Sequence, residues 1–150
     1  NSYEIQDAMT VEDDTHKITF VTPPSENVEI ELCCFVDIAS TDTEINVSLS
    51  TGSATDGYTA VAQKLEYDSG NSIAFSDDEI DDSIIVVKWV LEAAELASIG
   101  SSNTFYVAFS TGGVTKTAYI RYGFRSSHNT AYPPMFIKAT ALPETIYDGS

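Results

Sequence analysis

A run of acidic side chains near the middle of the chain is the densest set of groups that could hold a ligand. It consists of Asp77, Asp78, Glu79, Asp81 and Asp82. Carboxylate oxygens are the ligands that Ca²⁺ prefers, and the ion takes about six to eight of them. The run lacks EF-hand spacing, because neither the glycine of the sixth loop position nor the glutamate of the twelfth follows Asp77. We expect a solvated acidic loop, with calcium as the alternative and no other cofactor.

Catalytic chemistry has little support in the sequence. His16 and His128 are the only histidines, and no G-x-S-x-G segment supplies a nucleophile for a Ser-His-Asp triad. A glycosidase needs two carboxylates across a cleft. A sandwich of this length leaves little room for such a cleft. We therefore predict that the protein is not an enzyme.

The segment 103–125, NTFYVAFSTGGVTKTAYIRYGFR, predicts two strands joined at Gly112 and Gly113. Two glycines suit a two-residue turn in which both residues have positive φ. Pairing across this turn places Tyr106 opposite Tyr119. One face of the hairpin would then be apolar, while the other would carry tyrosine rings, threonines and Arg121. We expect the second face to be covered by another sheet or by a partner.

Aromatic and cationic side chains are the main candidates for a contact with another protein. Tyrosine and arginine are enriched among the residues that dominate binding energy at interfaces. The partner-binding candidates are Tyr106, Tyr119, Arg121, Arg125, Tyr132 and Tyr147. Trp89 lies on an apolar stretch, so we expect it to pack in the core rather than to stack on a sugar.

Charge is distributed unevenly along the 150 residues. The net charge is −16, and residues 1–100 carry −18 while residues 101–150 carry +2. Binding of nucleic acid requires a basic surface that releases counterions, so the composition argues against it. It argues against anionic membranes for the same reason. The nearly neutral, tyrosine-rich second half is where we expect a protein contact.

Cys33 and Cys34 are adjacent in the sequence. In a strand they point to opposite faces, so a disulfide between them would have poor geometry. We expect two free thiols, which suits a reducing compartment. The sequence has no apolar run of about 18 residues and no secretory signal pattern at its start.

Alternating apolar residues predict short strands separated by turns. The expected strands lie at 16–22, 28–38, 43–50, 58–67, 72–75, 83–91 and 135–142, in addition to the two strands of 103–125. Residues 92–99 contain good helix formers followed by Gly100, which predicts one short helix. This pattern predicts an all-β fold, an antiparallel β-sandwich of jelly-roll or immunoglobulin-like type. We divide the chain into an N-terminal arm (1–14), the sandwich (15–142) and a C-terminal tail (143–150).

This layout resembles the small all-β decoration, or cement, proteins of tailed-bacteriophage capsids and related virion accessory proteins. The features that carry the resemblance are a polar N-terminal arm from Asn1, an acidic sandwich and the closing segment PPMFIKATALPETIYDGS. The resemblance implies a structural protein located in the virion, bound to capsid protein or to further copies of itself. The expected state is a homo-oligomer or part of a larger assembly. No residue roles follow from it.

Two other functions fit the same pattern. A carbohydrate-binding or adhesin-type module, with or without structural calcium, would use exposed tyrosines as a stacking surface. An extracellular filament subunit would use a terminal strand to complete the sheet of its neighbour.

Overall fold

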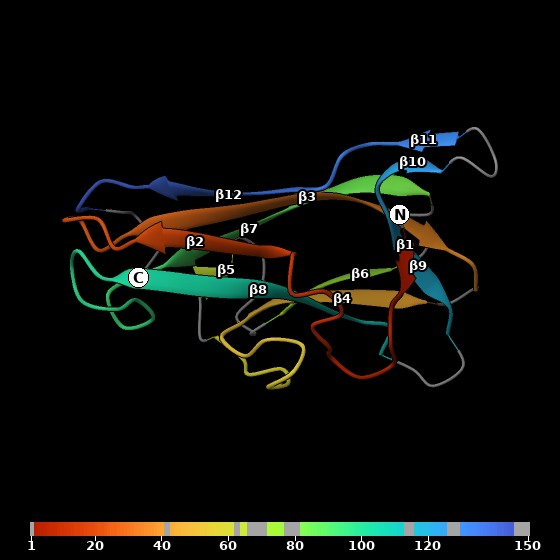
Figure 1. The fold of residues 1–150 in the computed structure, drawn as a ribbon, viewed down its shortest axis with the longest axis horizontal. Coiled ribbons are helices and arrows are strands. Elements are labelled where there is room, and N and C mark those ends of the chain that lie inside the picture. The colour runs from red at the N-terminus through yellow and green to blue at the C-terminus, as the bar shows by residue number, and fades with distance from the viewer. Residues whose placement is uncertain are drawn as a thin grey trace.

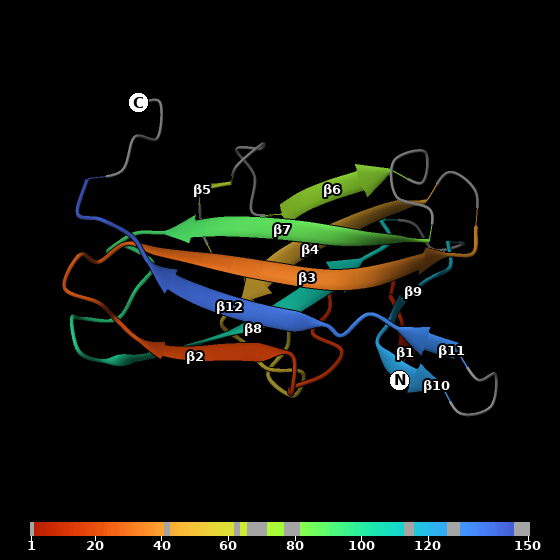
Figure 2. The same cartoon turned by 90° about the horizontal axis from the view of Figure 1, so that it is seen from above.

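The chain folds into two antiparallel sheets that pack face to face in a computed structural model (Figures 1 and 2). The structure describes residues 2–40, 43–61, 64–65, 72–76, 82–112, 116–125 and 130–145, with the backbone alone for 64–65, 72–76, 124–125 and 130. This arrangement confirms the predicted all-β, antiparallel architecture.

Sheet A is the larger layer. Its strands lie in the order β1 (Ser2–Glu4), β9 (Ala118–Arg121), β3 (Val28–Ile38), β7 (Ser83–Leu91) and β5 (Lys64–Leu65), and β12 (Phe136–Ala141) also pairs with β3. Sheet B has the order β2 (Lys17–Val21), β8 (Ser102–Ser110), β4 (Glu44–Ser50) and β6 (Ser72–Ser76). The strands β10 (Gly123–Arg125) and β11 (Thr130–Tyr132) form a separate hairpin.

The core lies between the two sheets, where the apolar residues of each strand meet. Along β3 the side chains alternate between buried and half-buried, because successive residues point to opposite faces. The largest fully buried side chains are Ile5, Ile30, Leu32, Ile45, Leu49, Trp89, Leu91, Phe109 and Ile120. The opposite face of sheet A, which we call its outer face, carries Glu29, Glu31 and other polar groups of β3.

One edge of β3 is shared by two segments that are distant in sequence. β9 pairs with the C-terminal part of β3 and ends with Arg121 opposite Phe35, whereas β12 pairs with the N-terminal part and begins with Phe136 opposite Cys33. Between them the chain leaves the sheet and forms the β10–β11 hairpin, which lies beyond one end of β12 (Figure 2). Gly123 has a φ of 69° at the start of this excursion, a conformation that favours glycine.

The outer face of sheet B is covered by a loop of the same chain. By alternation Ser48 and Ser50 should point away from the core, yet both are fully buried. Ser48 Oγ lies 3.0 Å from Tyr58 Oη, and Ser50 Oγ donates a hydrogen bond to the carbonyl oxygen of Gly52. The loop at residues 51–61 therefore shields this part of sheet B from solvent.

The predicted hairpin between residues 103–111 and 114–125 is wrong. β8 pairs with β2 and β4 in sheet B, whereas β9 pairs with β1 and β3 in sheet A. Tyr106 and Tyr119 consequently lie on different sheets. The apolar faces were predicted correctly, since Phe105 and Ile120 are both buried. Alternation identifies the buried face of each strand but cannot distinguish two strands that pair from two strands that pack across a core.

The predicted short helix at residues 92–99 is also wrong, because this segment forms turns. Its backbone groups bond to side chains of other segments: the Ala97 N–H donates to Asn103 Oδ1 at 2.8 Å, and Thr22 Oγ1 donates to the Ala97 carbonyl oxygen at 2.9 Å. So short a helix has too few internal hydrogen bonds to offset its nucleation cost. The hydrogen bonds to Asn103 and Thr22 hold the backbone of this segment in a non-helical conformation instead.

Both segments that we separated from the sandwich touch it where they are described. Within residues 2–14, β1 pairs with β9, and Ile5 and Val11 are buried. In the tail, the carbonyl oxygens of Pro143 and Glu144 accept hydrogen bonds from Asn27 Nδ2 at 2.9 and 3.1 Å. Residues 146–150 lie outside the described part of the chain.

Candidate functional site

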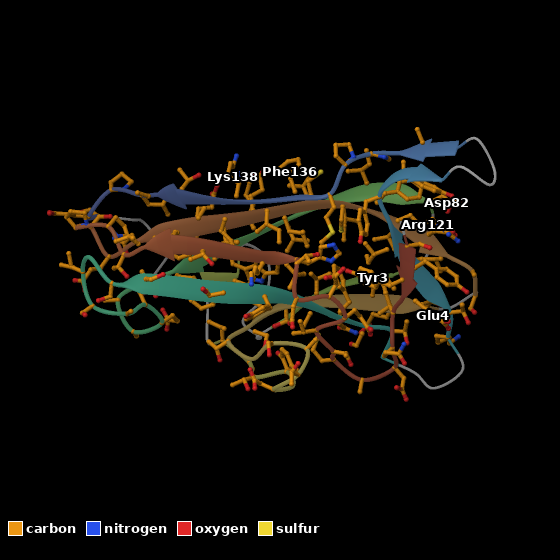
Figure 3. The ribbon with its side chains drawn as sticks, in the orientation of Figure 1. Tyr3, Glu4, Asp82, Arg121, Phe136 and Lys138 are labelled. Carbon is orange, nitrogen blue, oxygen red and sulfur yellow. The ribbon has the colours of Figure 1, made fainter. Side chains whose placement is uncertain are left out.

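Three of the predicted partner-binding residues meet at one end of sheet A. Tyr119 and Arg121 come from β9, and Tyr132 comes from β11 of the neighbouring hairpin. Asp37 of β3 is ion-paired with Arg121 and lies opposite Tyr119 in the sheet. We call these four residues the Arg121 cluster, and Figure 3 shows where Arg121 lies in it.

The guanidinium of Arg121 is held on several sides. Its Nε donates a hydrogen bond to Asp37 Oδ2, and the two side chains are only 15% and 24% exposed. The guanidinium carbon lies 4.7 Å from the ring centroid of Tyr119 and 5.7 Å from that of Tyr132. Arginine over a tyrosine ring is a favourable cation–π geometry. The charge of Arg121 is therefore neutralised inside the molecule.

This arrangement fixes the β10–β11 hairpin against the sheet. The ring of Tyr132 packs against Phe35 with 5.4 Å between centroids, in addition to its contact with Arg121. Tyr119 and Tyr132 remain half-buried, so each keeps part of its ring accessible. What the cluster offers a binding partner is a preorganised pair of tyrosine rings rather than an available guanidinium.

The remaining partner-binding candidates do not join this cluster. Tyr106 lies on β8 in sheet B, where Lys17 Nζ is 5.6 Å from the centroid of its ring. The backbone of Arg125 belongs to β10, while the side chain of Arg125 and all of Tyr147 lie outside the described residues. Trp89 is fully buried, which excludes it as a sugar-stacking surface.

The acidic run is described only at its last residue. Asp82 is exposed and has a φ of 47° immediately before β7, while Asp77, Asp78, Glu79 and Asp81 lie outside the described residues. Within the described part of the chain, no group of three or more His, Cys, Asp or Glu side chains could hold a metal ion. The calcium hypothesis for the complete run stays a prediction.

His16 belongs to an aromatic cluster beneath the Arg121 end of the sandwich. Its Nδ1 lies 3.2 Å from Tyr3 Oη, and its ring meets that of Tyr122 edge-on with 5.0 Å between centroids. Burial lowers the pKa of His16, with a smaller opposing effect from Asp13. Burial also raises the pKa of Tyr3 well above its usual value. Both groups are therefore neutral at neutral pH. His128 lies outside the described residues.

Sequence reasoning missed an apolar patch on the outer face of sheet A. Ile84 and Val86 of β7 and Phe136 of β12 are 53%, 54% and 45% exposed. Cys33 and Phe35 of β3 lie beside them, because Cys33 pairs with Val86 on one side and with Phe136 on the other, and Phe35 pairs with Ile84. These five residues form what we call the apolar patch. Apart from Lys88, residues 83–91 carry apolar side chains on both faces, so the sequence pattern does not distinguish the exposed face from the buried one.

A row of charged side chains borders the apolar patch. Lys88 Nζ lies 3.3 Å from Glu31 and 3.5 Å from Glu29, and Lys138 Nζ lies 3.5 Å from Glu31. We call these four residues the charged ladder. Figure 3 shows Lys138 and Phe136 projecting from β12 on the side of the sheet that faces away from sheet B.

No protein-family model matches the sequence, and no curated protein matches it at a significant level. In the part of the chain that the structure describes, no helix is long and apolar enough to cross a membrane.

Proposed function

We propose that this protein is a non-enzymatic structural component of a virus particle, of the kind that decorates tailed-bacteriophage capsids. The observation that carries the proposal is the order of the strands. Sheet A contains the path β1-β9-β3-β7, and sheet B has the order β2-β8-β4-β6. We assign this order to an eight-stranded jelly roll. In that fold the eight strands form two Greek keys and are divided between two four-stranded sheets.

The jelly roll supports this function only by analogy. It is the architecture of viral capsid domains, and also of lectins and cupins, so the fold alone does not determine an activity. In this scheme β9 and β12 are two parts of one strand that pairs with the same side of β3, and the β10–β11 hairpin is an insertion into it. Insertions of this kind place recognition residues beside a rigid sheet.

The outer face of sheet A supplies the support from the site itself. Tyrosine rings preorganised by Arg121 lie at one end of this face, on a chain whose net charge of −16 disfavours nucleic acid and anionic membranes as partners. Aromatic and apolar anchors within a polar rim are typical of protein–protein interfaces. The particle contact in this account uses Tyr119, Tyr132 and the β10–β11 hairpin.

The proposal is tested on particles from the virus or host culture that produces the chain. Particles are purified on a density gradient, and the chain is quantified in each fraction by mass spectrometry against the most abundant capsid protein. We expect the chain to follow the particle band at a constant ratio to that protein. Recovery of the chain only with cell envelopes, or only in the soluble fraction, would contradict the proposal.

A carbohydrate-binding module is the second candidate, because lectins share the jelly-roll architecture and Tyr119 and Tyr132 are half-exposed. Glycan binding that is lost in Tyr132→Ala, without particle association of the wild-type chain, would favour it. A filament subunit has less support from the structure, since β1 and β12 already pair within their own sheet.

A further inference from the structure

We infer that the outer face of sheet A is a surface through which two copies of this chain associate face to face. The starting observation is the apolar patch. Ile84, Val86 and Phe136 leave about half of their side chains in solvent, and Cys33 and Phe35 connect them across three neighbouring strands. Contiguous exposed apolar groups with a polar rim mark interaction sites.

Electrostatics indicate a second copy as the occupant. The outer-face positions of β3, β7, β9 and β12 carry the carboxylates Glu29, Glu31 and Asp37 and the cations Lys88, Lys138 and Arg121. These charges cancel, although the chain as a whole carries −16. Two carboxylates add negative charge at the rim, Glu4 of β1 and the exposed Asp82 directly before β7. Two copies repel each other over most of their surfaces and approach with least repulsion where the balanced charges of these two faces meet.

The outer face of sheet A is also complementary in shape to a second copy of itself. An interface with two-fold symmetry uses one patch on both partners, so an apolar centre meets an apolar centre. The faces of two sheets pack about 10 Å apart with their side chains interdigitated. The second sheet of the molecule does not offer the same surface, because residues 51–61 cover Ser48 and Ser50 there.

The dimensions predict a weak, reversible dimer. β3 contains 11 residues, which at about 3.3 Å per residue span roughly 36 Å, and three strands at about 4.8 Å are roughly 14 Å wide. The flat footprint is therefore roughly 500 Å² per copy, below the ~800 Å² per partner of a standard interface. We expect dissociation constants in the micromolar range or weaker.

The experiment is sedimentation velocity of the full chain from about 1 μM to about 1 mM. The test variant is Val86→Glu, which places a charge within the apolar patch. The matched control is Val21→Glu on β2 of sheet B, because Val21 is 59% exposed and Val86 is 54% exposed. We expect the wild type and Val21→Glu to dimerise alike, and Val86→Glu to dimerise at least about tenfold more weakly. A wild type that stays monomeric overturns the inference, as does equal dimerisation of the two variants.

A second measurement does not depend on the folding of any variant. Isotopically light and heavy wild-type chains are mixed and treated with an amine-reactive cross-linker. We expect cross-links between one light and one heavy chain that join Lys88 or Lys138 to Lys88 or Lys138. Intermolecular cross-links that avoid both lysines and join Lys17 instead would place the contact on sheet B and overturn the inference. A soluble dimer needs no virus particle, so this inference and the proposed function can fail separately.

Discussion

Arg121 and Phe136 lie on the same edge of β3, opposite Phe35 and Cys33, with only Cys34 between those two partners. Residues 122–135 separate them in the sequence. The odd-numbered positions of β3 point outward, so Arg121 and Phe136 face the same side of sheet A. The β10–β11 hairpin is therefore an excursion from an otherwise continuous strand. The Arg121 cluster and the apolar patch are therefore neighbours on the outer face of sheet A.

The first prediction is that the sandwich folds without the hairpin. Deletion of residues 123–135 joins Tyr122 to Phe136, which places Tyr122 opposite Cys34 and keeps every other partner of β3 in register. Tyr122 also retains its contact with His16. We expect a cooperative thermal transition and an unchanged far-ultraviolet circular dichroism spectrum typical of strands. A molten or aggregated product would show that the hairpin is part of the folding unit.

The second prediction concerns the ion pair of the Arg121 cluster. Arg121→Met and Asp37→Asn each leave a partly buried charge without its partner, which costs about 1–3 kcal/mol of unfolding free energy. The double variant should cost less than the sum of the two, because the second change removes the charge that the first left unpaired. Urea unfolding measures all three values. Lys88→Met in the more exposed charged ladder is the control and should cost less. Strictly additive costs at Arg121 and Asp37 would contradict the described pairing.

The third prediction is a loss of stability in mild acid that originates at His16. Burial places the pKa of His16 in the folded chain below its ordinary value of 6.5, so the folded state favours the neutral ring. Above pH 6.5 the ring is neutral in both states, and its full contribution to stability is present. As the pH falls below 6.5, the unfolded chain takes up the proton first, and stability declines until the folded pKa is passed.

The control for this prediction is His16→Gln, which cannot titrate. We expect its unfolding free energy to vary less than that of the wild type between about pH 8 and pH 5. Glu12 acts in the opposite direction, because burial raises its pKa and its protonated form is favoured in the folded state. Parallel pH profiles for the wild type and His16→Gln would show that His16 is not the source.

The fourth prediction distinguishes the two adjacent thiols. Cys34 is buried in the core, and burial raises its pKa far above that of a free thiol. Cys33 is half-buried in the apolar patch, and desolvation and Glu31 raise its pKa less. Because the thiolate is the reactive form, we expect Ellman's reagent at pH 8 to modify Cys33 slowly and Cys34 only on unfolding. The variant Cys33→Ser leaves Cys34 as the only thiol. Rapid reaction of this variant in its native state would contradict the burial of Cys34.

Local sequence patterns were sufficient for much of the secondary structure and for the direction in which side chains point. The alternation in residues 28–38 predicted both the strand β3 and its buried face, as Leu32 and Cys34 show. Strand partners were harder to predict, because pairing depends on contacts between segments far apart in the chain. Gly112 has the positive φ that the predicted turn requires, yet the strands on its two sides belong to different sheets.

The candidate site was predicted in part. The residue types alone identify Tyr119, Arg121 and Tyr132, but the grouping of both tyrosine rings around Arg121 depends on the excursion of the hairpin, which no local pattern reveals. The apolar patch was missed for a related reason. By residue type, Ile84 and Val86 would be expected in the core. The structure exposes them because β7 pairs with β3 in sheet A and turns these two side chains to the outer face.

We propose that this chain binds a virus particle through Tyr119, Tyr132 and the β10–β11 hairpin. The most direct test removes the chain from purified particles with denaturant or altered salt and adds back purified protein. We predict saturable rebinding of the wild type and of Val21→Glu, and at least about tenfold weaker rebinding of the Tyr119→Ala, Tyr132→Ala double variant. Equal rebinding of the double variant would contradict the assignment of this surface. A wild-type chain that does not rebind to particles would contradict the proposed function itself.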